Sequence, residues 1–269
     1  MKFIFQIIGW GIACYFLIGG ALYFFQEKML FFPMGNAFGN CSRMDRYAAK
    51  AVDSDGIRYY LKESDTAGLW IIVFHGNAGG ACDRTYFYDL LSGLDANLVL
   101  FEYPGYGGGH HKPGETIIRE QALTLVRQIK DSRNGHLPVY LLGESLGTGV
   151  ATWVSTQTEI SGLILISAYT AISDVAAHHY PWLPVRYLLK HKFPAAAWAA
   201  QTSSSAILFH GREDDIIPIK FAREQVMHFK AGARLIEIEH CGHNDIVDRG
   251  GSVLRDEITS FVSSGLQQQ

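Results

Sequence analysis

The chain has 269 residues, of which 48% are hydrophobic and 18% are charged. This balance is typical of a protein with a sizeable buried core, and it excludes a largely disordered chain. The formal net charge is −3 and no basic tract stands out, so we expect no nucleic-acid partner.

The chain opens with an apolar segment. From Phe3 to Phe25 the only strongly polar side chain is Gln6, and a helix of that length can cross a bilayer. We therefore expect residues 1–30 to form an N-terminal transmembrane anchor of a single-pass membrane protein. A cleaved signal peptide is the alternative, because Gly19–Ala21 is a stretch of small residues that a peptidase could use. The apolar run continues to Phe25, which favours a retained anchor.

The orientation of the anchor is poorly determined by charge. Lys2 precedes the apolar run, whereas Lys28, Arg43 and Arg46 follow it. The rule that basic residues stay in the cytoplasm slightly favours a cytoplasmic catalytic domain.

The four cysteines show neither a CxxC pair nor a disulfide-rich spacing. We expect free thiols at all four positions, which are Cys14, Cys41, Cys82 and Cys241. Cys241 lies two residues before His243, so a Cys–His dyad is an alternative. We disfavour it, because catalytic Cys–His pairs are usually assembled from distant segments.

After Pro33, short apolar runs alternate with helical periodicities. This alternation predicts a mainly parallel sheet flanked by helices, with function at the carboxyl ends of the strands. The expected strands are 70–74, 98–101, 139–142, 163–166, 207–209 and 235–238. The expected helices are 115–130, 145–156, 219–229 and 253–262, and residues 52–61 add a candidate antiparallel edge.

The strand at 139–142 runs into the pentapeptide Gly143-Glu144-Ser145-Leu146-Gly147 and then a helix. A GxSxG pattern between a buried strand and a helix is typical of a nucleophile elbow, in which two glycines permit a sharp turn. We predict Ser145 as the nucleophile. The Leu146 amide at the helix start is suited to stabilise a developing oxyanion.

A serine hydroxyl needs a base, and in this arrangement the acid and then the histidine follow the serine. His243, in the loop after the last strand, is favoured over His228 and His240. The acid is expected after the strand at 207–209, where Glu213, Asp214 and Asp215 are all eligible, and Asp174 is a rival.

The first parallel strand delivers His75-Gly76-Asn77-Ala78-Gly79-Gly80. This loop can supply a second oxyanion amide from Asn77 or Ala78, and His75 is expected to be structural. No dinucleotide or P-loop pattern and no metal-ligand spacing is evident, so we predict no cofactor and no metal.

Together these motifs resemble the membrane-anchored α/β-hydrolases with a minimal cap, which include lipase-like and depalmitoylase-like proteins. The matching segments follow in order along nearly the whole chain: Leu30–Pro33, His75–Gly79, Tyr103–Gly107, Gly143–Gly147, Tyr180–Val185, His210–Asp214 and Gly242–Asp245. The resemblance implies an α/β-hydrolase domain over 31–269.

The resemblance also implies Asp214 as the triad acid, His243 as the base, and Asn77 with Leu146 as the oxyanion pair. Two departures are Glu102, where the family often has Asp, and Ser203–Ser205, where it often has Pro. Serine rather than aspartate at position 145 argues against haloalkane dehalogenases and epoxide hydrolases.

The insert around 168–204 is expected to be a short cap rich in aromatic residues and proline. These residues either line an apolar pocket over Ser145 or simply cover the edge of the sheet. The expected activity is hydrolysis of an acyl ester or thioester at a membrane, on a small-molecule or lipid-like acyl substrate or an acylated protein. A peptidase or amidase of the same fold and a catalytically idle binding protein are the alternatives.

Overall fold

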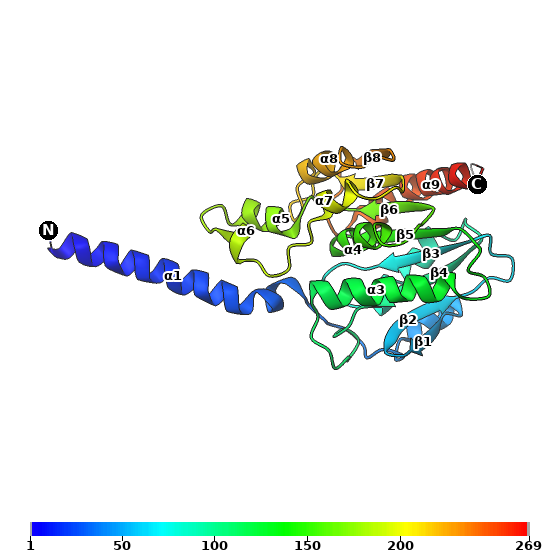
Figure 1. The fold of residues 1–269 in the computed structure, drawn as a ribbon, viewed down its shortest axis with the longest axis horizontal. Helices are drawn as coiled ribbons and strands as arrows, with labels where there is room; N and C mark the ends of the chain where they lie inside the picture. Colours follow the sequence, from blue (N-terminus) through cyan, green and yellow to red (C-terminus); the bar gives the residue numbers. More distant parts are fainter. Residues whose placement is uncertain (1, 268–269) are drawn as a thin grey trace.

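The computed structural model describes residues 2–267, which form a twisted eight-stranded sheet with helices on both faces and one long helix, α1, projecting from the body (Figure 1). The strands are β1 Lys50–Ser54, β2 Ile57–Lys62, β3 Leu69–Phe74, β4 Ala96–Glu102, β5 Val139–Glu144, β6 Gly162–Ile166, β7 Ala206–Gly211 and β8 Ala233–Ile238. The helices are α1 Lys2–Leu30, α2 Tyr86–Leu90, α3 Glu115–Lys130, α4 Leu146–Ser155, α5 Ile172–His179, α6 Val185–Leu188, α7 Ala195–Ala199, α8 Lys220–Val226 and α9 Ile246–Leu266.

The strand order is β1-β2-β4-β3-β5-β6-β7-β8, and the strands from β4 to β8 are parallel. The antiparallel edge expected at 52–61 is a pair of strands, β1 and β2. Because the chain passes from β3 to β4 on one side and returns to β5 on the other, the loops after β3 and β5 meet at a switch point. Such a point is where α/β sheets build their sites.

Both faces of the sheet are covered, which explains why its parallel strands are continuous apolar runs. On one face, Ile72 packs with Leu125 of α3 and Val150 of α4. On the other, Ile71 packs with Phe87 of α2 and Ile258 of α9. The predicted α/β-hydrolase architecture, with a mainly parallel central sheet, is confirmed.

Helix α1 is long and apolar enough to cross a membrane, and its apolar side chains point outward. Leu17 and Phe24, for example, are 74% and 77% exposed. The part of α1 from Tyr15 onward contacts the rest of the protein.

The expected cap region divides into two parts. Helices α5 and α6 lie beside the carboxyl-terminal half of α1 (Figure 1), where Tyr15 donates a hydrogen bond to the carbonyl oxygen of Trp182 at 3.0 Å. Helix α7 instead belongs to the body, since Trp198 and Ala199 lie in the core beneath the sheet.

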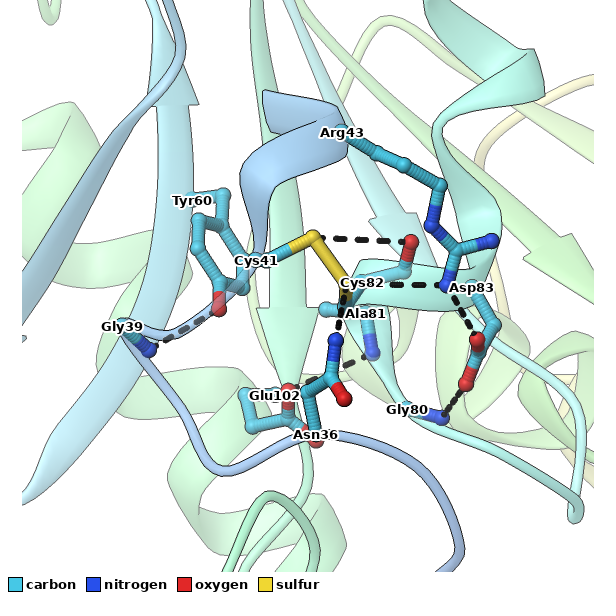
Figure 2. Close-up of a disulfide and its surroundings, with 10 residues drawn as sticks. All are labelled: Asn36, Gly39, Cys41, Arg43, Tyr60, Gly80, Ala81, Cys82, Asp83 and Glu102. Carbon is cyan, nitrogen blue, oxygen red and sulfur yellow. Dashed lines mark hydrogen bonds and ion pairs between the residues drawn. A yellow bond between two sulfur atoms is a disulfide. The ribbon is translucent and has the colours of Figure 1, made fainter. Parts of the chain in front are cut away.

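The expectation of four free thiols is wrong for two of them. Cys41 and Cys82 form a disulfide, with their Cα atoms 5.9 Å apart (Figure 2). Cys14 and Cys241 are free. The bond fastens the segment that follows α1 to the chain just after the loop of β3. An ion pair between Arg43 and Asp83 at 2.6 Å lies beside it. Because the two cysteines are 41 residues apart, their spacing carried no signal of pairing.

Candidate active site

Ser145 sits at a strained turn between β5 and α4, with φ of 51° and ψ of −117°. A residue other than glycine adopts such φ and ψ angles only when the surrounding structure holds it there. The two flanking positions must be glycine, because other backbone atoms approach them too closely to leave room for a Cβ. A Cβ on Gly147 would lie 2.0 Å from the carbonyl oxygen of Phe74, and one on Gly143 would lie 2.5 Å from that of Gly147. The turn therefore packs against the end of β3 and exposes the serine oxygen.

The structure brings Ser145, His243 and Asp214 into one chain of hydrogen bonds. His243 Nε2 lies 3.0 Å from Ser145 Oγ, and His243 Nδ1 lies 2.7 Å from Asp214 Oδ2. An ionised carboxylate can only accept, so Nδ1 carries the proton and Nε2 is left to accept from the serine hydroxyl. The imidazole is thus oriented as a base toward Ser145.

Asp214 is held as an anion. Burial by itself would raise its pKa, but hydrogen bonds from His210 and His243 outweigh burial and leave the pKa well below its ordinary value. Its other oxygen accepts from the backbone amides of Ile216 at 3.0 Å and Ile217 at 2.7 Å. His210 was not singled out by the sequence reasoning, although it stands in the quoted motif His210–Asp214.

The rival side chains are engaged elsewhere. Asp174 accepts from Thr170 and pairs with Arg186, and Glu213 pairs with His240 on the surface. Cys241 is buried, and burial raises the pKa of its thiol.

The loop after β3 lies against Ser145 and is fixed from three sides. The carbonyl oxygen of Asn77 accepts from the Phe32 amide at 3.0 Å and from the Tyr106 hydroxyl at 2.7 Å. The Asn77 side chain donates to the carbonyl oxygen of Leu30 at 3.1 Å. The Leu146 amide belongs to the first turn of α4, where N–H groups have no intrahelical acceptor. Asn77 and Leu146 border the same cavity as Ser145.

A mostly buried ionic cluster supports this loop. Arg84 Nε lies 2.5 Å from Glu144 Oε2, and the Tyr86 hydroxyl donates to the other oxygen of Glu144. The Gly76 amide donates to Glu144 at 3.2 Å, and Arg84 donates to the Ala78 carbonyl at 2.9 Å. Sequence reasoning missed this role, because Glu144 occupies a variable position of the pentapeptide and Arg84 is distant in the chain.

The electrostatics of the cluster favour its charged form. Burial opposes ionisation of Glu144, but the charge of Arg84 and hydrogen bonds from Tyr86 and Arg84 leave the pKa of Glu144 below its ordinary value. Behind the loop, His75 is stacked on Tyr103 with ring centroids 3.8 Å apart. Burial lowers the pKa of His75 to about 3, so it is a neutral structural residue at physiological pH.

A cavity of about 420 Å³ opens over Ser145. Its polar wall carries His243, Asn77 and Arg84, and its apolar wall is formed by Phe32, Ile172, Val175, Ala176, Ile216 and Ile217. Across residues 2–267, no group of three or more His, Cys, Asp or Glu side chains is placed to hold a metal ion. The arrangement can therefore offer a nucleophile, a base and two amides to a carbonyl group.

Comparisons with known proteins agree with this geometry. Residues 70–197 match the sequence family described as the alpha/beta hydrolase fold. An uncharacterised protein of Mycobacterium tuberculosis is 29% identical over 245 residues, which cover 88% of this chain and 87% of that protein. The lysophosphatidylserine lipase of Danio rerio is 30% identical over 196 residues, and the match covers 65% of this chain and 50% of the lipase. The chain thus spans about half the length of that relative.

Solved structures share the fold at low identity. The Pyrococcus furiosus esterase PF2001 superposes with a TM-score of 0.66 at 15% identity, covering 87% of this chain and 98% of the esterase. Est1E from Butyrivibrio proteoclasticus gives a TM-score of 0.63 at 16% identity, covering 80% of this chain and 99% of Est1E. The sheet order, the strand–serine–helix turn and these matches together show the α/β-hydrolase fold and support membership of the α/β-hydrolase superfamily.

Proposed function

We propose that this protein is a membrane-tethered serine hydrolase that cleaves carboxylic esters or thioesters of acyl groups. The observation that carries the proposal is the hydrogen-bonded series from Ser145 through His243 to Asp214 at the strained turn before α4. Membership of a hydrolase superfamily and similarity to a relative named as a lipase support ester chemistry.

In the proposed reaction, Ser145 Oγ attacks the carbonyl carbon while His243 Nε2 takes the hydroxyl proton. The oxyanion accepts hydrogen bonds from the backbone amides of Asn77 and Leu146. Imidazolium then gives its proton to the leaving alkoxide or thiolate, and an acyl-enzyme remains. Water, activated by His243, hydrolyses the acyl-enzyme and regenerates Ser145. Asp214 stays ionised throughout and stabilises the imidazolium.

The tether is proposed to be α1. Its outward apolar surface suits a bilayer, and its contacts with the cap argue that it is retained. Cleavage near Gly19–Ala21 would remove Tyr15, whose hydroxyl is bonded to the cap. A retained helix explains that contact, whereas a cleaved signal peptide would abolish it.

The disulfide bears on which side of the membrane the catalytic domain lies. Disulfides persist in oxidising compartments and are rare in the cytosol. The Cys41–Cys82 bond therefore supports a non-cytoplasmic catalytic domain, against the slight preference drawn from basic residues. We give the disulfide more weight, because few basic residues flank the anchor on either side.

The test is labelling of the full chain by a serine-reactive fluorophosphonate, with Ser145→Ala as the variant and Ser167→Ala as the matched control. Ser167 borders the same cavity, but its side chain is buried and its hydroxyl lies outside the hydrogen-bonded series. We expect labelling of the parent and of Ser167→Ala, and none of Ser145→Ala. Equal labelling of Ser145→Ala would end the assignment, and an unlabelled parent would favour an idle scaffold.

A further inference from the structure

A second cavity lies outside the catalytic machinery, between the carboxyl-terminal half of α1 and helices α5 and α6. We propose that this groove is an acyl-chain subsite, which receives the hydrocarbon chain of a membrane-derived substrate while the carbonyl carbon lies at Ser145. The proposal rests on the proposed hydrolase function and adds to it the place where the substrate's chain binds.

The lining of the groove is almost wholly hydrocarbon. It has a volume of about 180 Å³, and its walls include Leu22 and Met29 from α1 and Leu183, Val185, Leu188 and Leu189 from the cap. Gln26 is the one strongly polar side chain among the lining residues, and it is already satisfied. Its amide oxygen accepts from the Lys190 backbone at 2.7 Å, and its nitrogen donates to the Tyr23 carbonyl at 2.7 Å. A charged or hydrogen-bonding ligand would find few partners there.

The groove adjoins the catalytic cavity. Leu30, Ile172 and Ala176 line both spaces, so the two cavities share a wall. Ile172 and Ala176 are four residues apart on α5 and therefore lie on the same side of that helix. In our proposal, a chain that leaves the carbonyl at Ser145 passes these three apolar residues to reach the groove.

The groove also lies next to the proposed membrane, which is a source of hydrocarbon chains. One of its walls is the helix proposed as the membrane anchor, and the cap touches this helix as far along as Tyr15. The cap itself presents apolar side chains outward, with Trp182 and Tyr187 52% and 88% exposed. A surface of this kind suits the membrane interface, where aromatic side chains concentrate. An acyl chain can therefore reach the groove from the leaflet, whereas a water-soluble acid or a peptide would have to cross lipid.

Two neighbouring glycines provide a matched test. A Cβ on Gly19 would lie 3.8 Å from Leu183 Cδ2, so a larger side chain there projects into the groove. A Cβ on Gly20 would meet nothing within 4 Å. Gly19→Leu and Gly20→Leu add the same side chain to the same helix, and only the first obstructs the groove. Leu183→Trp fills the groove from its opposite wall. This second variant shows whether a loss in Gly19→Leu comes from the filled groove or from a disturbed α1.

The measurement is kcat/KM of the full chain in phosphatidylcholine nanodiscs, for p-nitrophenyl butyrate, octanoate, laurate and palmitate. For the parent we expect a rise of about fourfold for each methylene that enters the groove, until the groove is full. Gly19→Leu and Leu183→Trp should lose at least about tenfold on laurate and keep butyrate hydrolysis within about twofold. Gly20→Leu should match the parent on all four esters.

The failures can be told apart. The subsite proposal fails while the hydrolase function stands if the parent cleaves butyrate through Ser145 but Gly19→Leu and Leu183→Trp keep the parent's chain-length profile. It is also overturned if Gly20→Leu loses laurate hydrolysis as much as Gly19→Leu does, because the effect would then come from the helix in the bilayer. If the parent cleaves none of the esters, the hydrolase function fails, and the subsite fails with it.

Discussion

The side-chain amide of Asn77 donates a hydrogen bond to the carbonyl oxygen of Leu30, 3.1 Å away. This bond joins the last residue of α1 to the loop that borders Ser145. The neighbouring Phe32 amide bonds the Asn77 carbonyl, so the chain leaving the helix runs alongside the loop as a short parallel bridge. Helix α1 is thus part of the framework of the candidate site.

Asn77→Ala keeps the backbone amide but loses this bond. We expect kcat for ester hydrolysis to fall about fivefold, since a hydrogen bond of this kind contributes about 1 kcal/mol to holding the loop in place. Asn40→Ala, at an exposed position, is the matched control and should leave kcat unchanged. Steady-state kinetics on one soluble ester measures both, and an unchanged kcat for Asn77→Ala would mean that the loop does not depend on Leu30.

Asp214→Asn tests the proposed acid. The amide cannot stabilise a positively charged His243, and kcat should fall by about four orders of magnitude while the fold is retained. Asp215→Asn is the matched control, because Asp215 is the exposed neighbour on the same loop. A loss of similar size in both variants would point to the loop rather than to the carboxylate that His243 contacts.

Glu144→Gln leaves Arg84 without its charge partner in a mostly buried site. The loss of one member of such a pair costs about 3 kcal/mol, which corresponds to a fall in Tm of about 6–12 °C. The kcat should fall as well, because Gly76 and Ala78 lose part of their support.

The double variant Glu144→Gln with Arg84→Met removes the unpaired charge and should recover part of the lost stability. Thermal unfolding followed by circular dichroism measures both proteins. A single variant as stable as the parent would show that the pair contributes nothing to the fold.

Glu102 makes stability depend on pH. Burial raises the pKa of this carboxyl to about 7, despite a hydrogen bond from the Ala81 amide at 3.3 Å. The unfolded chain ionises near the ordinary value of 4.5, so the folded state holds the proton more tightly. The stabilisation is fully present below pH about 4.5 and is lost as the pH rises through about 7, a change of about 3 kcal/mol.

In Glu102→Gln this contribution is removed, so the free energy of unfolding should change less between pH 4.5 and 7 than in the parent. Urea unfolding at a series of pH values measures the difference. Glu63→Gln, at an exposed position, should keep the parent's profile. Identical pH profiles for the parent and Glu102→Gln would contradict the assignment.

The disulfide predicts both a stability change and a thiol pattern (Figure 2). Cys41→Ser opens a loop of 41 residues, and the chain-entropy relation gives a loss of about 4 kcal/mol. A reducing agent should lower the Tm of the parent and leave that of Cys41→Ser unchanged, while Cys14→Ser should respond as the parent does.

In intact cells, a maleimide should reach Cys41 and Cys82 only after reduction. Free thiols at these positions before reduction would place the catalytic domain in a reducing compartment. That result would reverse the orientation favoured by the disulfide.

Local patterns predicted much of the fold. The apolar runs marked each parallel strand to within two residues, and α3 was expected at its observed bounds. Helix α9 begins at Ile246, seven residues before its predicted start at Val253. Gly250 and Gly251 interrupt the apolar periodicity there, and Gly250 lies in the helix because its backbone packs closely on Ile238.

The candidate site was less predictable where tertiary contacts decide. Sequence motifs predicted Ser145 as the nucleophile and His243 as the base. Without the family resemblance, they did not distinguish Glu213, Asp214 and Asp215 as the acid. The difference between the three lies in burial and in the Ile216 and Ile217 amides, which only the folded loop brings to Asp214. No local sequence pattern predicted the Arg84–Glu144 pair or the contacts between α1 and the cap, because both join distant segments of the chain.

If α1 spans a bilayer as we propose, the hydrogen bond between Leu30 and Asn77 links the thickness of that bilayer to the candidate site. A bilayer thinner or thicker than the apolar length of a helix changes the tilt of that helix. A change in the tilt of α1 would strain its junction with the body at Leu30, and the loop beside Ser145 is fastened to that residue. We expect turnover to vary with acyl length in the host bilayer even for a soluble ester, so the membrane would act as an effector of the enzyme as well as its location.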